Sequence, residues 1–292
     1  ELVVARIVRG LPSGAAMSAM GAGLLDLHKS KGTIANAVAP LTGTALGAIG
    51  SGLLVQYLPV PARLVYLLLF GVFVVQAIAL LYMAEPALRR PGAWASLRPR
   101  FGLPANVRGP VLAAIPVLVA MWALVGFDGS IAPALVRKLV GSNSFVFGGL
   151  PLFLLAGSGA VSVLSLRAAS ARFEMLAGVS GLLVGAGLTL LAVEFGSAAL
   201  FFVGGSVAGA GFGAAFQGAI RTVLPLVAPH ERAGVLSVVY VVSYLAMGLP
   251  AVVAGFLVVY DGGVLTSARE YGVAVIGLAA VALAGLARSG RM

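Results

Sequence analysis

The chain contains no cysteine and only two histidines among its 292 residues. The absence of cysteine excludes disulfides, thiol nucleophiles and thiolate metal sites. The two histidines, His28 and His230, fall in predicted loops, and no HExxH, GxSxG or P-loop pattern is present. The nine acidic residues are scattered, so no pair is placed for acid–base catalysis. We therefore expect no enzyme, no metal site and no cofactor.

Charge is also scarce, because only 10% of the residues are charged whereas 60% are hydrophobic. The mean hydropathy of +1.08 excludes a soluble domain and predicts an all-α, multi-pass membrane protein. Continuous apolar runs favour helices over barrel strands, in which apolar and polar residues would alternate. Nine spans are predicted, at residues 3–25, 34–57, 64–84, 110–131, 145–166, 173–194, 198–220, 234–259 and 271–288.

The net charge of +10 follows from topology rather than from a nucleic-acid partner. Of the 19 basic residues, 13 lie in one set of alternate loops, between Lys29 and Arg291, and two lie in the first span. The opposite loops hold only four, namely Arg63, Arg137, Lys138 and Arg269. The positive-inside rule places the richer loops and the C-terminus in the cytoplasm. The many Ala, Gly and Val residues, with more Arg than Lys, favour a bacterial inner membrane protein.

An internal repeat suggests that the chain is incomplete. Gly14-Ala15-Ala16 recurs as Gly213-Ala214-Ala215, and the His28-x-x-x-Gly32 pattern recurs at residues 230–234. The segment 52–57 is echoed at 255–260, so three matches occur in order at nearly one offset. A duplicated membrane unit explains this order. Since three spans precede the second copy and none precede the first, we expect about three helices before Glu1.

The only long hydrophilic stretch is residues 85–108, which contains five arginines and four prolines. Proline interrupts a long helix, and the arginines and aromatic residues suit the cytoplasmic membrane surface. The stretch therefore divides the chain into a partial N-terminal bundle at 1–84, a cytoplasmic linker at 85–108 and a C-terminal six-helix bundle at 109–292.

Two spans carry a pattern that resembles a known family. The first reads Arg6-x-x-Arg9-Gly10-x-Pro12, and it is similar to the R-x-x-Q-G-x-G-A-A motif of the fourth helix of the major facilitator superfamily. Arg6 and Gly10 match that motif. The second span carries Pro40 and Gly43, which match the G-x-x-x-G-P-x-x-G-G antiporter motif of helix five, although alanine or threonine replaces the other glycines. The segment from Pro229 to Pro250 is similar to the loop and eleventh helix of bacterial members.

The resemblance covers the whole chain as helices four to twelve of a twelve-helix transporter. It implies two six-helix bundles that rock about a central cavity, a role for Arg6 in proton coupling, and a conformational role for Gly10, Pro40 and Gly43. From the residues alone, Arg6 instead suits a side chain that reaches the outer interface, and Pro40 suits an ordinary kink.

The second half supplies candidates for the substrate cavity, which are Trp122, Asp128, Gln217, Tyr240 and Tyr244. Tyr240 and Tyr244 lie four residues apart and so share one face of a helix. Aromatic and polar groups on one stripe suit amphipathic molecules, and core packing is the alternative. Asp128, after a long apolar run, is either a cavity carboxylate or a cap at the outer helix end.

The predicted function is therefore proton-coupled efflux of small amphipathic compounds by a monomer in the lipid bilayer. Its partners are the small-molecule substrate and protons. Two alternatives remain open, which are a proton-coupled importer of sugars or metabolites and a non-transporting remnant of such a transporter.

Overall fold

The computed structural model describes Met20, Leu24 and residues 29–82, 103–228, 231–260 and 262–289. Every regular element within these ranges is a helix. The predicted span 3–25, with Arg6 and Gly10, lies outside the described residues, as does most of the predicted linker at 85–108.

Eight of the described helices are long and apolar enough to cross a membrane, which confirms a multi-pass helical membrane protein. A helix satisfies every backbone polar group internally, and this is what lets such apolar segments cross lipid. The long helices are α2 (Lys29–Tyr57), α3 (Pro61–Leu81), α5 (Ala105–Ser130), α7 (Phe145–Leu166), α8 (Ala171–Phe195), α9 (Ala198–Val223), α10 (Arg232–Tyr260) and α11 (Gly263–Ser289). Two short elements accompany them, α6 (Ala132–Val140) and η1 (Leu224–Leu226).

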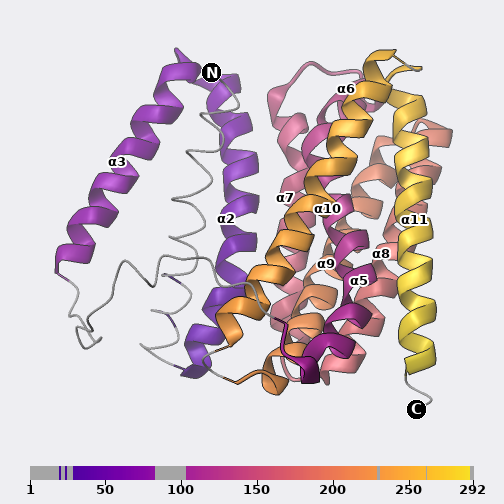
Figure 1. Cartoon of the computed structure of the whole chain (residues 1–292). Helices are drawn as coiled ribbons and strands as arrows, with labels where there is room; N and C mark the ends of the chain where they lie inside the picture. Colours follow the sequence, from indigo (N-terminus) through magenta and orange to yellow (C-terminus); the bar gives the residue numbers. More distant parts are fainter. Residues whose placement is uncertain are drawn as a thin grey trace.

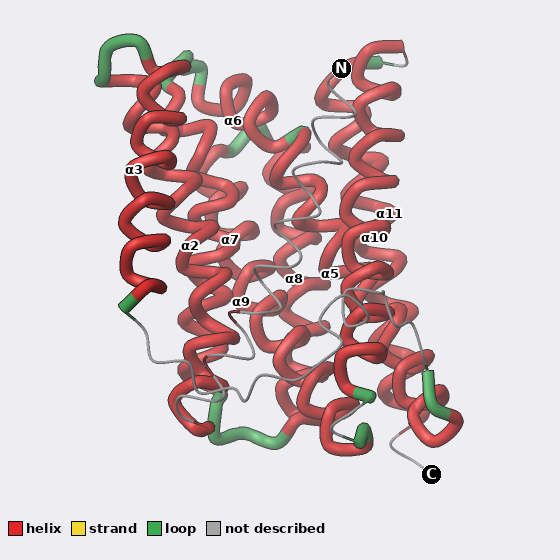
Figure 2. The backbone as a smooth tube through the Cα atoms, turned by 60° about the vertical axis from the view of Figure 1, so that its left-hand side comes forward, coloured by secondary structure: helices red, strands yellow, loops and turns green. Residues whose placement is uncertain are grey.

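The helices from α5 to α11 form one bundle, as Figure 1 shows. Helix α9 packs between α8 and α7, α10 packs on α5, and α11 packs on both α8 and α5. Helix α2 lies along α7, at the edge of this bundle. Helix α3 leans away beyond α2 and buries none of its residues (Figures 1 and 2). The core therefore sits within the bundle from α5 to α11.

The long helices run alternately up and down. Helices α2, α5, α8 and α10 begin at the end of the bundle where α3, α7, α9 and α11 finish (Figure 1). The described residues of the basic-rich set share that end, and they are Lys29, Lys31, Arg108, Arg167, Arg172, Arg221, Arg232 and Arg288. Arg63, Arg137, Lys138 and Arg269 lie toward the opposite end. The one-sided distribution expected from the sequence is thus present, and its orientation toward the cytoplasm stays a prediction.

Glycine allows the backbones of α7, α8 and α9 to approach closely. A Cβ added at Gly178 of α8 would lie 2.6 Å from Cα of Ala215 on α9, and one added at Gly211 would lie 2.5 Å from the backbone nitrogen of Leu182. Gly213 of α9 abuts the backbone of Gly159 on α7 in the same way. Small residues at helix contacts are the usual means of association in lipid. Most of the glycines of α9 therefore serve packing.

The structure differs from the hydropathy prediction most clearly in the starts of two helices and in one helix that was not predicted. Helix α5 begins at Ala105, inside the predicted linker 85–108, and α11 begins at Gly263 rather than at 271. The first turns of α11 include Arg269, and its charge lowers the local hydropathy below that of a span. In the structure Arg269 forms an ion pair with Glu194 of α8, which accommodates the charge. The sequence prediction missed α6 altogether, because nine residues with Arg137 and Lys138 in the last turn are too short and too polar to read as a span.

Candidate functional site: an aromatic surface

Trp122 lies near the middle of α5, where its indole meets aromatic rings from two other helices. Its centroid is 5.6 Å from that of Phe212 and 6.2 Å from that of Phe216, both on α9 and both edge-on to the indole. Tyr244 of α10 lies 5.6 Å away in a tilted arrangement. These separations are typical of favourable ring pairs. Three helices thus converge on one indole.

Tyr240 extends the group along α10. Its ring stacks on that of Tyr244 at 6.4 Å, as the four-residue spacing predicts, and lies 6.5 Å from that of Phe216. We call Trp122, Phe212, Phe216, Tyr240 and Tyr244 the aromatic cluster. Phe212 is buried, Trp122 and Phe216 are half-buried, and the two tyrosines are 38% and 48% exposed. The cluster is therefore a surface with a packed base and two accessible phenol rings.

Two buried polar atoms, one on α5 and one on α9, have no hydrogen-bond partner among the described residues. Nε1 of Trp122 and Oε1 of Gln217, which follows Phe216 on α9, are both buried without a hydrogen bond from the described residues. Buried polar atoms in proteins are almost always paired, so an exception calls for an explanation. An indole N–H donates and an amide oxygen accepts, so each of these buried atoms leaves one hydrogen bond unmade.

Asp128 does not join the aromatic cluster, because it lies further along α5, near the end of the helix, and faces Tyr271 of α11. It is only 3% exposed, and its Oδ2 has no partner among the described residues. The hydroxyl of Tyr271 on α11 donates a 2.7 Å hydrogen bond to the carbonyl of Ala123 and interacts electrostatically with Asp128. Asp128 is therefore a buried carboxyl near one helix end rather than an exposed cap.

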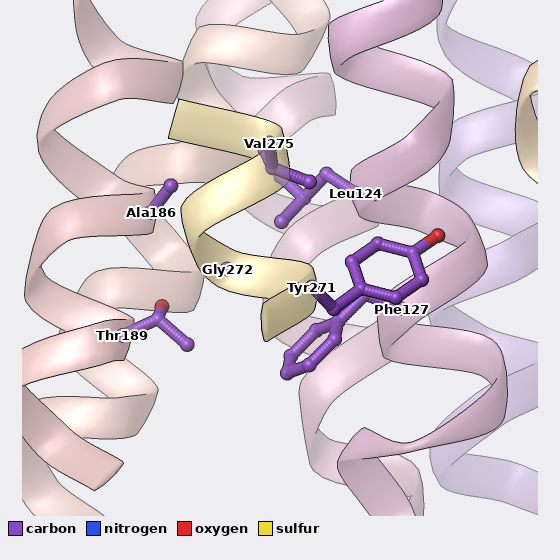
Figure 3. A pocket seen from close by; sticks show the side chains of 7 residues that line it. All are labelled: Leu124, Phe127, Ala186, Thr189, Tyr271, Gly272 and Val275. Atoms are coloured by element: carbon purple, nitrogen blue, oxygen red, sulfur yellow. The ribbon is translucent and has the colours of Figure 1, made fainter. Parts of the chain in front are cut away.

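Tyr271 also closes a small cavity between α5, α8 and α11. Figure 3 shows its ring beside Phe127, with Thr189 of α8 across the cavity. The cavity volume is about 10 Å³ and its lining is almost wholly apolar. A space of that size holds at most one water molecule, and this lining offers too few polar partners to retain it. This cavity is a packing gap and not a substrate site.

Two ion pairs tie α8 to its neighbours at opposite ends. Glu174, at the start of α8, is fully buried and accepts a 2.7 Å hydrogen bond from Arg221 of α9, whose side chain is 39% exposed. Its second oxygen, Oε2, has no partner among the described residues. At the other end, Glu194 pairs with Arg269 of α11 at 2.6 Å, and both side chains are nearly half exposed. Arg221 therefore serves Glu174 rather than Gln217, four residues before it.

The residues matched to the antiporter motif lie away from the aromatic cluster, on α2. Pro40 and Gly43 are exposed, and a Cβ added at Gly43 would meet nothing within 4 Å. Helix α2 contacts α7 further along, where a Cβ on Gly52 would lie 2.9 Å from the carbonyl oxygen of Phe145. Arg6 and Gly10 lie outside the described residues, so their expected roles stay predictions.

Sequence reasoning missed Phe212 and Phe216 as members of the cluster. Their four-residue spacing on α9 is the signal that singled out Tyr240 and Tyr244 on α10. The abundant glycines around these two residues indicated helix packing rather than a binding surface.

Comparison with known proteins adds no relative to this picture. No family model, curated protein or solved structure matches the chain. Its function has to be argued from the site. Within the described residues, no group of three His, Asp or Glu side chains is placed to hold a metal ion.

Proposed function

We propose that the chain belongs to a secondary transporter of the major facilitator type that exports small amphipathic compounds in exchange for protons. In this proposal the chain supplies the equivalents of helices four to twelve. The observation that carries it is the aromatic cluster. It combines two exposed tyrosine rings with a buried, unpartnered indole N–H among helices that are long enough to cross a membrane.

The chemistry of the cluster favours amphipathic over strongly polar substrates. Aromatic faces bind apolar surface and attract organic cations through the ring quadrupole. The polar groups of these rings are few, namely Nε1 of Trp122 and two phenol hydroxyls. A sugar carries many hydroxyl groups, and each would lose a partner against rings such as Phe212 and Phe216. An importer of sugars therefore fits this surface less well than an exporter of amphipathic compounds.

The arrangement of helices supports a moving transporter. In this proposal α2 and α3 belong to one half of the transporter and α5 to α11 to the other, and α2 packs on α7 while it contacts α3 only slightly. Rocking of one helical group against another about a fixed site is the usual mechanism of secondary transporters. Gly52 of α2 and Gly149 of α7 bring the two backbones into close contact, so this is where the two halves would meet in the proposed transporter.

Asp128 is the described residue best placed to carry a proton in this scheme. An ionisable residue inside a membrane helix is expensive and is a functional hypothesis by default. Among the described residues it has no cationic partner that would hold it charged. Its proposed role is to take up and release a proton as α5 and α11 move, with Arg6 as a second contributor.

Transport by energised vesicles tests the proposal. Inverted vesicles from cells that express the whole gene product would be given ethidium, a small amphipathic cation, and a proton gradient. We expect ethidium accumulation that ceases when an uncoupler collapses the gradient. Tyr244→Ala should reduce the rate several-fold, whereas Tyr66→Ala, which removes an exposed tyrosine from α3, should not.

Asp128→Asn should abolish accumulation against a gradient while leaving passive exchange of ethidium. Absence of any proton-dependent flux of ethidium, with the protein present in the vesicles, would contradict the proposal. If ethidium still bound at the aromatic cluster, that result would favour the non-transporting remnant.

A further inference from the structure

A second cavity, apart from the aromatic cluster, lies between α10 and α11 and has a volume of about 380 Å³. That volume is within the range of about 300–1,000 Å³ that is usual for small-molecule sites. Its walls are two stripes of side chains, one on each helix, and Ala123 of α5 and Tyr271 form its floor. The stripe on α10 runs from Leu249 through Val253 to Leu257 and is wholly apolar.

The stripe on α11 is polar at one end only. It comprises Ser267, Glu270, Ala274 and Leu278, which follow one another on a single face of the helix. A rise of 1.5 Å per residue gives this stripe a length of about 16 Å. Its polar end lies near the start of α11 at Gly263, so the cavity runs from near the membrane surface toward the interior.

Both polar groups at that end lack a partner. The Ser267 side chain is 1% exposed, and its Oγ has no hydrogen bond from the described residues. The exposed carboxylate of Glu270 has no ion pair there either, although its neighbour Arg269 is paired with Glu194. Asp128, close to Tyr271 in the floor, adds a further carboxyl to this region. The end of the cavity is thus negative and the rest is apolar.

From this juxtaposition we infer that the α10–α11 cavity binds a single-chain amphiphilic cation, such as an alkylammonium, taken directly from the membrane. The ammonium lies against the Glu270 carboxylate. The bilayer interior offers a lipophilic cation no such anionic partner. The alkyl chain follows the apolar stripes toward Leu249 and Leu278. An amphiphile in one leaflet already has this orientation, so it enters without turning over. The inference deepens the proposed function, because it names a cationic substrate class and a second binding site apart from the aromatic cluster.

Binding of radiolabelled dodecyltrimethylammonium to the whole protein in phosphatidylcholine vesicles tests the inference. We expect Glu270→Gln to weaken binding about tenfold, because the quaternary ammonium loses the Coulombic attraction of a partly exposed carboxylate. Glu231→Gln removes a carboxylate from the loop before α10 and should change nothing. Ala274→Phe should block the cavity, whereas Ala280→Phe, on an exposed position of the same helix outside the cavity, should not.

The neutral analogue dodecanol should compete weakly, and equally well in wild type and Glu270→Gln. Equal affinity of the cation for wild type and Glu270→Gln would overturn the inference. So would competition by phosphatidylethanolamine that Glu270→Gln abolishes, because the occupant would then be a lipid headgroup. If Glu270→Gln did not affect binding of the cation but ethidium flux and its sensitivity to Tyr244→Ala were intact, the inference would be wrong and the proposed function would still hold.

Discussion

The two Glu–Arg pairs of α8 allow a direct test of how burial governs their strength. Both join neighbouring helices, and their N–O distances are nearly equal, at 2.7 Å for Glu174–Arg221 and 2.6 Å for Glu194–Arg269. They differ in exposure, because Glu174 is fully buried whereas Glu194 and its partner are 45% and 49% exposed. We predict that the buried pair is coupled several times more strongly than the exposed pair.

The magnitude follows from what each single substitution leaves behind. Arg221→Met keeps most of the apolar stem but leaves a buried carboxylate unpaired, and breaking a buried pair in this way costs about 3–5 kcal/mol. Because the Arg221 side chain is 39% exposed and water can replace part of it, we expect a value near the lower limit, about 3 kcal/mol. Adding Glu174→Gln to the Arg221→Met variant removes the unpaired buried carboxylate and should recover about 2 kcal/mol of the lost stability. The same cycle on Glu194 and Arg269 should give a coupling of about 0.5 kcal/mol.

The assay is reversible unfolding by dodecyl sulfate in mixed micelles, followed by circular dichroism, for the wild type and three variants of each pair. The coupling energy of each cycle is the difference between the double variant and the sum of the singles. High salt should weaken the coupling of the exposed pair and change that of the buried pair little. Equal coupling energies for the two pairs would refute the reasoning, since burial would then have no influence.

Two further outcomes follow from the packing of the helices. Gly178→Ala should destabilise the bundle by about 1–3 kcal/mol in the same unfolding assay, because the added Cβ meets the backbone of Ala215. Gly187→Ala, on the same helix, adds a Cβ in open space and should be neutral or slightly stabilising. Equal destabilisation by the two substitutions would contradict the packing. Gly52→Leu should separate α2 from α7, seen as faster proteolysis between the two helices, whereas Gly43→Leu should not; protection of the Gly52 variant would show that the close contact is dispensable.

Hydropathy predicted the membrane spans well because length and apolar content alone decide whether a helix can cross lipid. The eight spans that fall on described residues all correspond to long helices. Hydropathy could not predict α6, whose nine residues follow α5 almost directly and bury Leu135 and Val136. Nor could it place the start of α11, since the partner of Arg269 is 75 residues away in the chain.

The candidate site was predictable along each helix but not between helices. The spacing of Tyr240 and Tyr244 places both on one face of α10, and the structure stacks their rings. The rotation of α5 in the bundle decides which neighbour each of its side chains faces. It brings Trp122 to Tyr244 of α10 and Asp128 to α11. A single sequence carries no signal for that rotation. The partner of Glu174 was hidden for the same reason.

Binding at the aromatic cluster is the central claim, and the chain allows a direct measurement of it because it contains only two tryptophans. In a Trp94→Phe variant of these 292 residues, Trp122 is the one remaining tryptophan of the sequence. Titration with ethidium should quench this emission with saturation, and Tyr244→Ala should weaken the apparent affinity several-fold. The account predicts no saturable quenching in the reciprocal Trp122→Phe variant. Saturable quenching of Trp94 alone, or none of Trp122, would contradict the claim that this surface binds amphipathic compounds.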